Sequence, residues 1–176
     1  MGTAQRTKKI TVCAMISALG VVALYLGSFI EVLDISTAVL ASVMCTVTVI
    51  EYGKGAPWSV FLVTSLLSLL LLPNKLPALL YAVFFGYYPI IKEKIEKLRS
   101  VILQWVIKLC IFASAIALTF FASTIFAINV EMPADIIFKA IFAALIAITL
   151  ILYDLALTKI ISYYIIRLRH RFRKIF

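Results

Sequence analysis

Long hydrophobic runs, separated by short polar segments, constrain this chain more than any other feature. A helix needs about 20 mainly apolar residues to cross the hydrocarbon core of a bilayer. The segments between the runs hold charged residues, glycine or proline, which interrupt such helices. The runs cover residues 11–30, 35–50, 58–72, 76–91, 101–128 and 136–161. They predict an all-α polytopic membrane protein, with a six-helix bundle forming a single transmembrane domain over residues 1–176.

The composition excludes a soluble globular protein. Hydrophobic residues make up 64% of the 176 residues, and the mean hydropathy is +1.12. Such a chain lacks the polar surface of a water-soluble fold, and six crossings leave no room for a soluble catalytic domain. Because the runs 35–50, 58–72 and 76–91 are short for spanning, four helices with a re-entrant pair are an alternative.

Charge alternates from one connecting segment to the next. Basic residues gather at the N-terminus, at residues 92–99 and in an amphipathic tail at 162–176, whereas acidic residues occupy the turns at 31–34 and 131–135. Lys and Arg accumulate in cytoplasmic loops, so both termini are predicted to be cytoplasmic, in what we expect is a bacterial cell membrane. The net charge of +9 flanks hydrophobic spans, so membrane lipids, not nucleic acid, are the expected counter-ions.

Polar side chains concentrate in the loops that this topology places outside. If those loops converge, they form a site for a small polar ligand above an apolar bundle. The alternative is that they are ordinary solvated loop ends. The candidate substrate-binding residues are Glu31, Asp34, Asn74, Lys75, Asn129, Glu131, Asp135 and Lys139.

Two charged residues fall within the last two hydrophobic runs. Ionisable groups at membrane depth are costly and usually find partners inside the bundle. Lys108 and Asp154 lie on runs of opposite direction, each toward the inner end, so an intramembrane ion pair is predicted. The alternative is that Lys108 extends to the inner headgroups while Asp154 lies in the wet interface with Lys159.

No arrangement of residues in the sequence indicates catalysis. The single histidine, His170, lies in the basic tail, and metalloprotease motifs, phosphate-binding glycine-rich loops and aspartate clusters for Mg²⁺ are missing. Cys13, Cys45 and Cys110 are widely spaced in apolar runs, without a metal-binding or disulfide pattern. We therefore expect a protein that is not an enzyme and uses no cofactor or metal.

The start of the first run carries a resemblance to a known family. The chain reads Arg6-Thr-Lys-Lys-Ile-Thr-Val-Cys-Ala14-Met-Ile-Ser-Ala18-Leu-Gly20, a basic patch followed by small residues four positions apart. This resembles the S-components, the substrate-binding membrane subunits of energy-coupling factor (ECF) vitamin transporters. Leu33-Asp34-Ile35-Ser36 is similar to a Leu-Asp-aromatic-Ser stretch of riboflavin-type members. The charged segment 51–57 departs from the Gly-rich turn of many members.

The resemblance implies a function in nutrient or vitamin uptake. Ala14 and Ala18 would dock onto the transmembrane T-component, and ATPase subunits would supply the energy. The protein would capture a small molecule from outside, of a kind that the sequence leaves open. The alternative is a small membrane scaffold or lipid-interacting protein, with residues 92–99 and the basic tail as its working surfaces.

Overall fold

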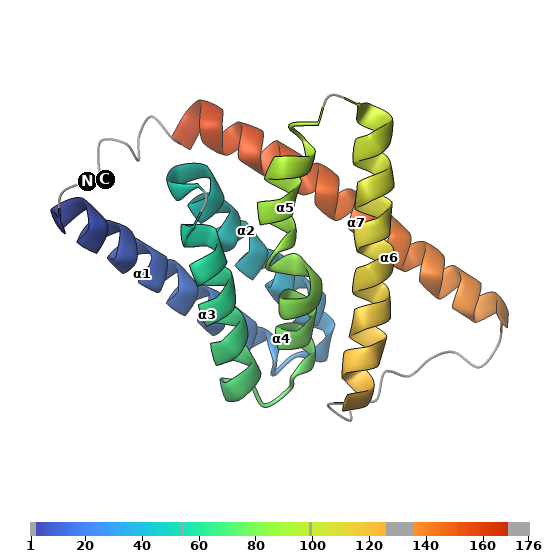
Figure 1. The fold of residues 1–176 in the computed structure, drawn as a ribbon. Helices are drawn as coiled ribbons and strands as arrows, with labels where there is room; N and C mark the ends of the chain where they lie inside the picture. The colour runs from blue at the N-terminus through green and yellow to red at the C-terminus, as the bar shows by residue number, and fades with distance from the viewer. Residues whose placement is uncertain (1–2, 54, 99, 126–135, 169–176) are drawn as a thin grey trace. The chain divides into compact units, whose positions relative to one another are not determined.

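The computed structural model describes residues 3–53, 55–98, 100–125 and 136–168. The described residues are almost entirely helical, and none lies in a β-strand (Figure 1). This confirms the all-α fold class. The elements are α1 (Thr3–Gly27), η1 (Glu31–Leu33), α2 (Asp34–Tyr52), α3 (Ala56–Leu71), α4 (Leu76–Leu80), η2 (Tyr81–Phe85), α5 (Tyr88–Ile95), α6 (Val101–Ile125), α7 (Ile136–Tyr163) and η3 (Tyr164–Leu168).

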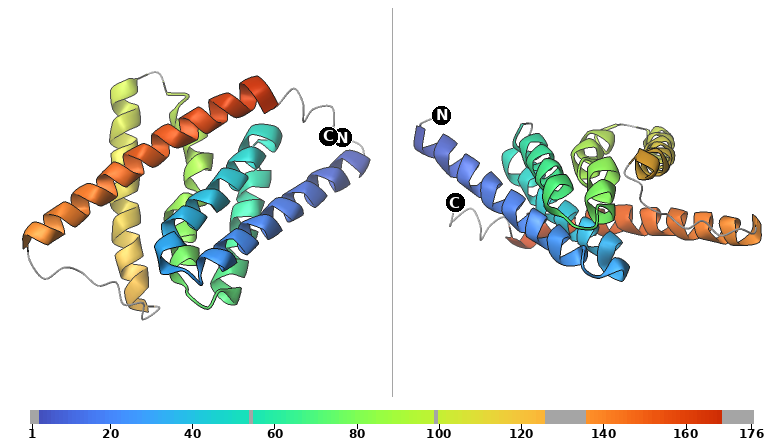
Figure 2. Two further views of the ribbon diagram at one scale, coloured as in Figure 1. Left: turned by 180° about the vertical axis from the view of Figure 1, so that it is seen from behind. Right: turned by 90° about the horizontal axis from the view of Figure 1, so that it is seen from below.

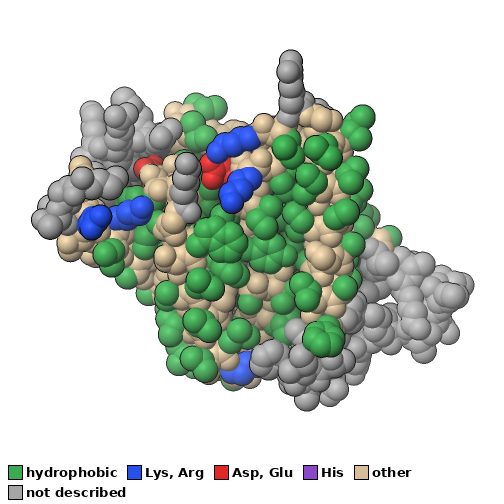
Figure 3. Space-filling model, viewed as in Figure 1, with side chains coloured by type: hydrophobic (Ala, Val, Ile, Leu, Met, Phe, Trp, Pro, Cys, Tyr) green, Lys and Arg blue, Asp and Glu red, His purple; other side chains and the backbone are tan. Residues whose placement is uncertain are grey.

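Four of the described helices are long and apolar enough to cross a membrane. The qualifying segments are Gln5–Gly27, Asp34–Tyr52, Ile102–Thr119 and Ala144–Ile166. Helix α3 is also apolar but has 16 residues, which corresponds to about 24 Å at 1.5 Å per residue. Hydrophobic side chains cover much of the surface over α3, α4 and α6 (Figure 3). Several apolar helices with exposed hydrophobic surfaces indicate a multi-pass membrane protein in contact with lipid.

The chain divides into two compact units, residues 1–128 and 129–176. The first unit contains α1 to α6, and the second contains α7 and η3. In the first unit, α1 runs obliquely across α2 and α3 (Figure 2). Glycines permit this close approach, because a Cβ at Gly27 would overlap the Thr37 side chain, and one at Gly20 would lie 3.2 Å from Thr64 Cγ2. Small residues at helix contacts are typical of membrane bundles.

Buried hydroxyl groups are distributed along α2 and α3. Ser42, Thr46 and Thr48 of α2 and Thr64 and Ser68 of α3 are all buried. Within α2, the Thr46 hydroxyl donates to the carbonyl oxygen of Ser42 at 2.9 Å, and the Thr48 hydroxyl donates to that of Cys45 at 2.7 Å. A helix carbonyl can accept this additional bond, so these hydroxyl groups are satisfied without water.

The segment from α4 to α5 forms one column in which a π-helical turn, η2, joins the two helices (Figure 1). The N–H of Gly86 donates to the carbonyl oxygen of Tyr81 at 2.7 Å, the five-residue spacing of a π-turn. Gly86 also leaves room for Phe61 of α3, since a Cβ would overlap its ring. On α6, Phe112 lies 5.5 Å from the ring centroids of Phe84 and Tyr88. Aromatic packing thus joins α6 to this column.

At each end of the first unit, a polar contact joins segments that are far apart in the sequence. At one end, the Lys9 ammonium of α1 lies 5.6 Å from the ring centroid of Tyr52, where α2 ends. At the other end, the start of α2 lies beside the turn between α3 and α4 (Figure 1), where Asn74 contacts Asp34. Segments that share a predicted side of the membrane therefore share an end of the first unit.

Candidate functional site

Asp34 and Asn74 form the polar centre of the end where α2 begins. Asp34 occupies the first turn of α2 and is 3% exposed. The Asn74 amide Nδ2 lies 3.5 Å from Asp34 Oδ2, forming a long hydrogen bond between two segments 40 residues apart. The backbone N–H of Leu76 donates to Asn74 Oδ1 at 3.0 Å, which orients the amide with its NH₂ group toward the carboxylate. Two of the predicted outer-loop residues are therefore brought into contact.

Lys75, the next predicted residue, is directed elsewhere. Its ammonium donates to the carbonyl oxygen of Leu72 at 2.6 Å and more weakly to that of Leu70 at 3.5 Å. These carbonyls belong to the last turn of α3, where the helix has no further N–H groups to offer them. A cation at this position also complements the negative end of the helix dipole. Lys75 therefore caps α3.

The other five candidate ligand residues cannot be placed beside this pair. Glu31 lies in η1, but its side chain is not among those described, and the same holds for Lys139 in the first turn of α7. Asn129, Glu131 and Asp135 lie outside the described residues. Their role in binding stays a prediction.

The two small residues of the family resemblance lie on the outer side of α1. Ala14 and Ala18 are exposed, whereas Ser17, Val21 and Leu24 are buried against the rest of the first unit. Exposed apolar side chains extend the same surface, with Met15 61% and Leu19 54% exposed. The sequence alone did not establish that Ala14 and Ala18 face away from the rest of the first unit.

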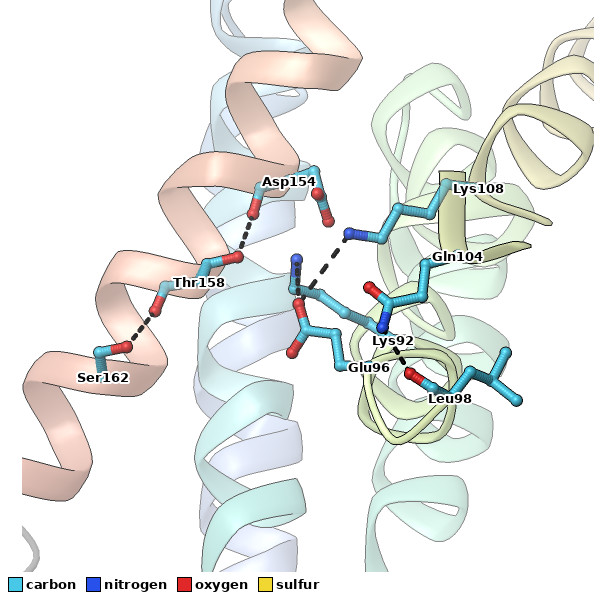
Figure 4. Close-up of polar contacts among 8 residues, drawn as sticks. All are labelled: Lys92, Glu96, Leu98, Gln104, Lys108, Asp154, Thr158 and Ser162. Carbon is cyan, nitrogen blue, oxygen red and sulfur yellow. Dashed lines mark hydrogen bonds and ion pairs between the residues drawn. The ribbon is translucent and has the colours of Figure 1, made fainter. Parts of the chain in front are cut away.

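A charge cluster joins α5 to α6 at the opposite end of the first unit (Figure 4). The Glu96 carboxylate oxygen Oε1 lies 3.0 Å from Lys92 Nζ and 4.0 Å from Lys108 Nζ. Lys92 is fully buried and Lys108 is 6% exposed. The Lys108 ammonium also lies 5.5 Å from the ring centroid of Trp105, a cation–π contact. Glu96 therefore serves two buried lysines on different helices.

Sequence reasoning found only the exposed part of this cluster. Glu93 and Lys97, whose four-residue spacing allows an ion pair on one helical face, lie 2.6 Å apart on the exposed side of the segment. Sequence reasoning missed the role of Lys92 and Glu96, which have the same four-residue spacing but lie on the side of the helix that carries buried Ile95. The signal was the alignment of Lys92 and Glu96 with this apolar residue along one helical face.

The predicted partner of Lys108 belongs to the second unit. Asp154 lies in α7, where its carbonyl oxygen accepts a hydrogen bond from the Thr158 hydroxyl at 3.0 Å, and the Thr158 carbonyl accepts one from Ser162 at 2.9 Å (Figure 4). Lys108 lies in the first unit. The Lys108 to Asp154 ion pair therefore stays a prediction.

Among the described residues, no group of three or more His, Cys, Asp and Glu side chains could hold a metal ion. Comparison of the sequence with protein-family models gives no match, and comparisons with curated proteins and solved structures give no significant match.

Proposed function

We propose that this protein is the substrate-capture subunit of an ECF-type transporter in a bacterial cytoplasmic membrane. It would bind a small nutrient or vitamin from outside and deliver it through association with a T-component and ATPase subunits. The sequence holds no phosphate-binding glycine-rich loop, so the energy would come from those partners. The proposal rests on family resemblance and on the positions of two small residues.

The observation that carries the proposal is the outward position of Ala14 and Ala18 on α1. Packing inside the first unit uses Gly20 and Gly27, at the contacts with α3 and α2. The two alanines belong to a different face, where their side chains are exposed. Small residues four positions apart let another helix approach closely. A partner helix would therefore find a flat surface here without disturbing the bundle.

The polar end of the first unit supports the capture step. Asp34 and Asn74 meet where α2 begins, whereas Lys9 and the cluster around Glu96 belong to the opposite, basic end. By the positive-inside rule the basic end is cytoplasmic, which would turn Asp34 and Asn74 outward. A ligand from outside would then meet the polar end first.

The test is association with a co-expressed T-component and its ATPases. Ala14→Trp and Ala18→Trp should each abolish co-purification, because an indole group prevents close helix approach. Ala117→Trp, at an exposed small residue of α6, is the matched control and should leave association intact. Retained co-purification of the complex with either α1 variant would contradict the proposal.

The second candidate function is that of a small lipid-interacting scaffold. It is favoured by the exposed lysines at the end of α5, of which Lys97 is 69% exposed by side chain, next to the exposed Leu98. Basic and apolar side chains together are typical of surfaces that bind anionic lipid. This function predicts that stability depends on anionic lipid and that association with the T-component fails in the unchanged protein.

A further inference from the structure

We propose that the turn between α1 and α2 is an apolar anchor that inserts into the outer leaflet of the bilayer. This outer anchor consists of Phe29, Ile30 and Val32, and its partner is the boundary between the acyl chains and the headgroups of that leaflet. The inference uses the topology predicted from charge and does not depend on the capture of a ligand. It is carried by the exposure of these side chains, by the hydrogen bonds of the turn and by the length of α1.

The side chains of the outer anchor are unusually exposed for apolar residues in a connecting segment. Phe29 is 64% exposed, Ile30 52% and Val32 88%. A turn that faces water is normally built from polar residues, glycine and proline. Transfer of large apolar side chains from water to an apolar environment is favourable. The composition of the turn therefore favours contact with lipid.

The outer anchor continues the apolar surface of α1. Val22 and Leu26 are exposed on this helix, and Phe29 follows at the same spacing of three to four residues, which places the three on one helical face. The ring of Tyr25 packs edge-on against the ring of Phe29, with the centroids 5.1 Å apart. Tyrosine is enriched where a membrane protein crosses the boundary between lipid and water. The surface that contacts lipid along α1 thus extends without a break into the turn.

The hydrogen bonds of the turn are made within the turn itself. The N–H of Ile30 donates to the carbonyl oxygen of Gly27 at 2.9 Å, and the N–H of Leu33 donates to that of Ile30 at 2.8 Å. The Ser28 hydroxyl donates to the carbonyl oxygen of Tyr25 at 2.7 Å. Lipid offers no hydrogen bonds, so a segment that enters it must satisfy its polar groups internally. These internal bonds meet that requirement while the apolar side chains point outward.

The length of α1 places the turn at the right depth. The Lys9 ammonium lies over the Tyr52 ring, a basic and aromatic pair typical of the inner headgroup level. From Lys9 to the end of the helix at Gly27, the rise is about 27 Å at 1.5 Å per residue. The hydrocarbon core is about 30 Å thick, and any tilt of the helix shortens the distance that it covers. The turn after Gly27 therefore begins at or below the outer boundary of the core.

A second apolar segment lies at the same end of the first unit. Leu70 and Leu71, in the last turn of α3, are 76% and 59% exposed. The turn between α1 and α2 and the turn between α3 and α4 occupy one end (Figure 2). These segments lead directly into the contact between Asp34 and Asn74. The polar pair is thus flanked by apolar side chains, which hold this end at the level of the outer headgroups.

The experiment measures the depth of a spin label in the full chain reconstituted in nanodiscs. The label is attached to Val32→Cys after Cys13, Cys45 and Cys110 have been replaced by alanine. Its collisions with oxygen, which concentrates in lipid, are compared with its collisions with a water-soluble nickel chelate. We expect oxygen to dominate at position 32. A label at Lys97→Cys, where the side chain is 69% exposed at the opposite end, is the control and should show the reverse.

Two results of this experiment would overturn the inference. A label at position 32 that collides mainly with the nickel chelate lies in water, and a label shielded from both probes is covered by protein, such as a second copy of the chain.

If the cysteine-free protein fails to fold, substitutions in the otherwise unchanged chain decide. Val32→Asp should lower the midpoint of thermal unfolding in nanodiscs by several degrees, because a carboxylate is costly in lipid, whereas Val32→Leu should leave it unchanged. Equal midpoints for the two variants would contradict the outer anchor. Neither measurement involves a ligand or the T-component, so failure here leaves the proposed function to its own test.

Discussion

The two ends of the first unit bury charge in opposite ways. Around Glu96, one carboxylate oxygen lies 3.0 Å and 4.0 Å from the ammonium groups of two buried lysines, so opposite charges compensate each other. At the other end, one contact of Asp34 crosses to the neutral amide of Asn74 at 3.5 Å. The first end therefore joins two helices through opposite charges, and the second joins two segments 40 residues apart through a contact with a neutral amide. This contrast separates the structural end from the proposed binding end.

The largest expected effect is at Glu96. Glu96→Ala leaves Lys92 and Lys108 buried without their shared carboxylate, which for a buried pair costs about 3 to 5 kcal/mol. Because the Glu96 side chain is 38% exposed, we expect a cost below this range, on the order of 2 to 3 kcal/mol. The measurement is thermal unfolding in detergent or nanodiscs. Glu93→Ala, which breaks the exposed pair with Lys97, is the control and should cost less than about 1 kcal/mol. Equal losses would remove the distinction between buried and exposed charge.

The predicted Lys108 to Asp154 ion pair would connect α6 with α7, and it is tested by exchanging the two charges. Lys108→Asp and Asp154→Lys should each destabilise the protein, by about 2 kcal/mol or more, because each places like charges together. The double exchange should recover at least 1 kcal/mol in a double-mutant cycle of unfolding. A double variant no better folded than either single variant shows that the pair does not form.

The smallest expected effect is at Lys75. Lys75→Met keeps the aliphatic stem but removes the donor to the last carbonyls of α3, at a cost of about 0.5 to 1 kcal/mol. Ligand binding should change little, because Lys75 is assigned to the helix end. The matched control is Lys94→Met at the exposed end of α5. A large change in ligand binding, in either direction, would mean that Lys75 belongs to the ligand site.

The sequence predicts the helices well because hydrophobic runs and their breaks are local signals. The run 35–50 corresponds to α2 at Asp34–Tyr52, and the run 58–72 to α3 at Ala56–Leu71. The π-turn at Tyr81–Phe85 escaped prediction because no charged residue interrupts the apolar run in which it lies. The local signal is Pro89, which cannot donate to the carbonyl oxygen four residues before it. The contact of Gly86 with the ring of Phe61 from α3 is tertiary and cannot be read from the local sequence.

The site was less predictable because the sequence of a loop does not reveal which way its charged side chains point. Asp34 and Asn74 are near each other, but Lys75 follows Asn74 directly and points its ammonium back to α3. The burial of Lys92 was missed for a related reason, since a basic segment looks solvated until the packing of its apolar side is known. Spacing gives the face of a helix, and only packing decides whether that face is buried.

The most direct test of the account is native mass spectrometry of the full chain purified from its host under gentle conditions. The account predicts a co-purified small molecule in the unchanged protein and in Glu93→Gln, whose change lies at the opposite end of the first unit from Asp34 and Asn74. Spectra that contain only phospholipid adducts in both proteins would contradict a substrate-capture function.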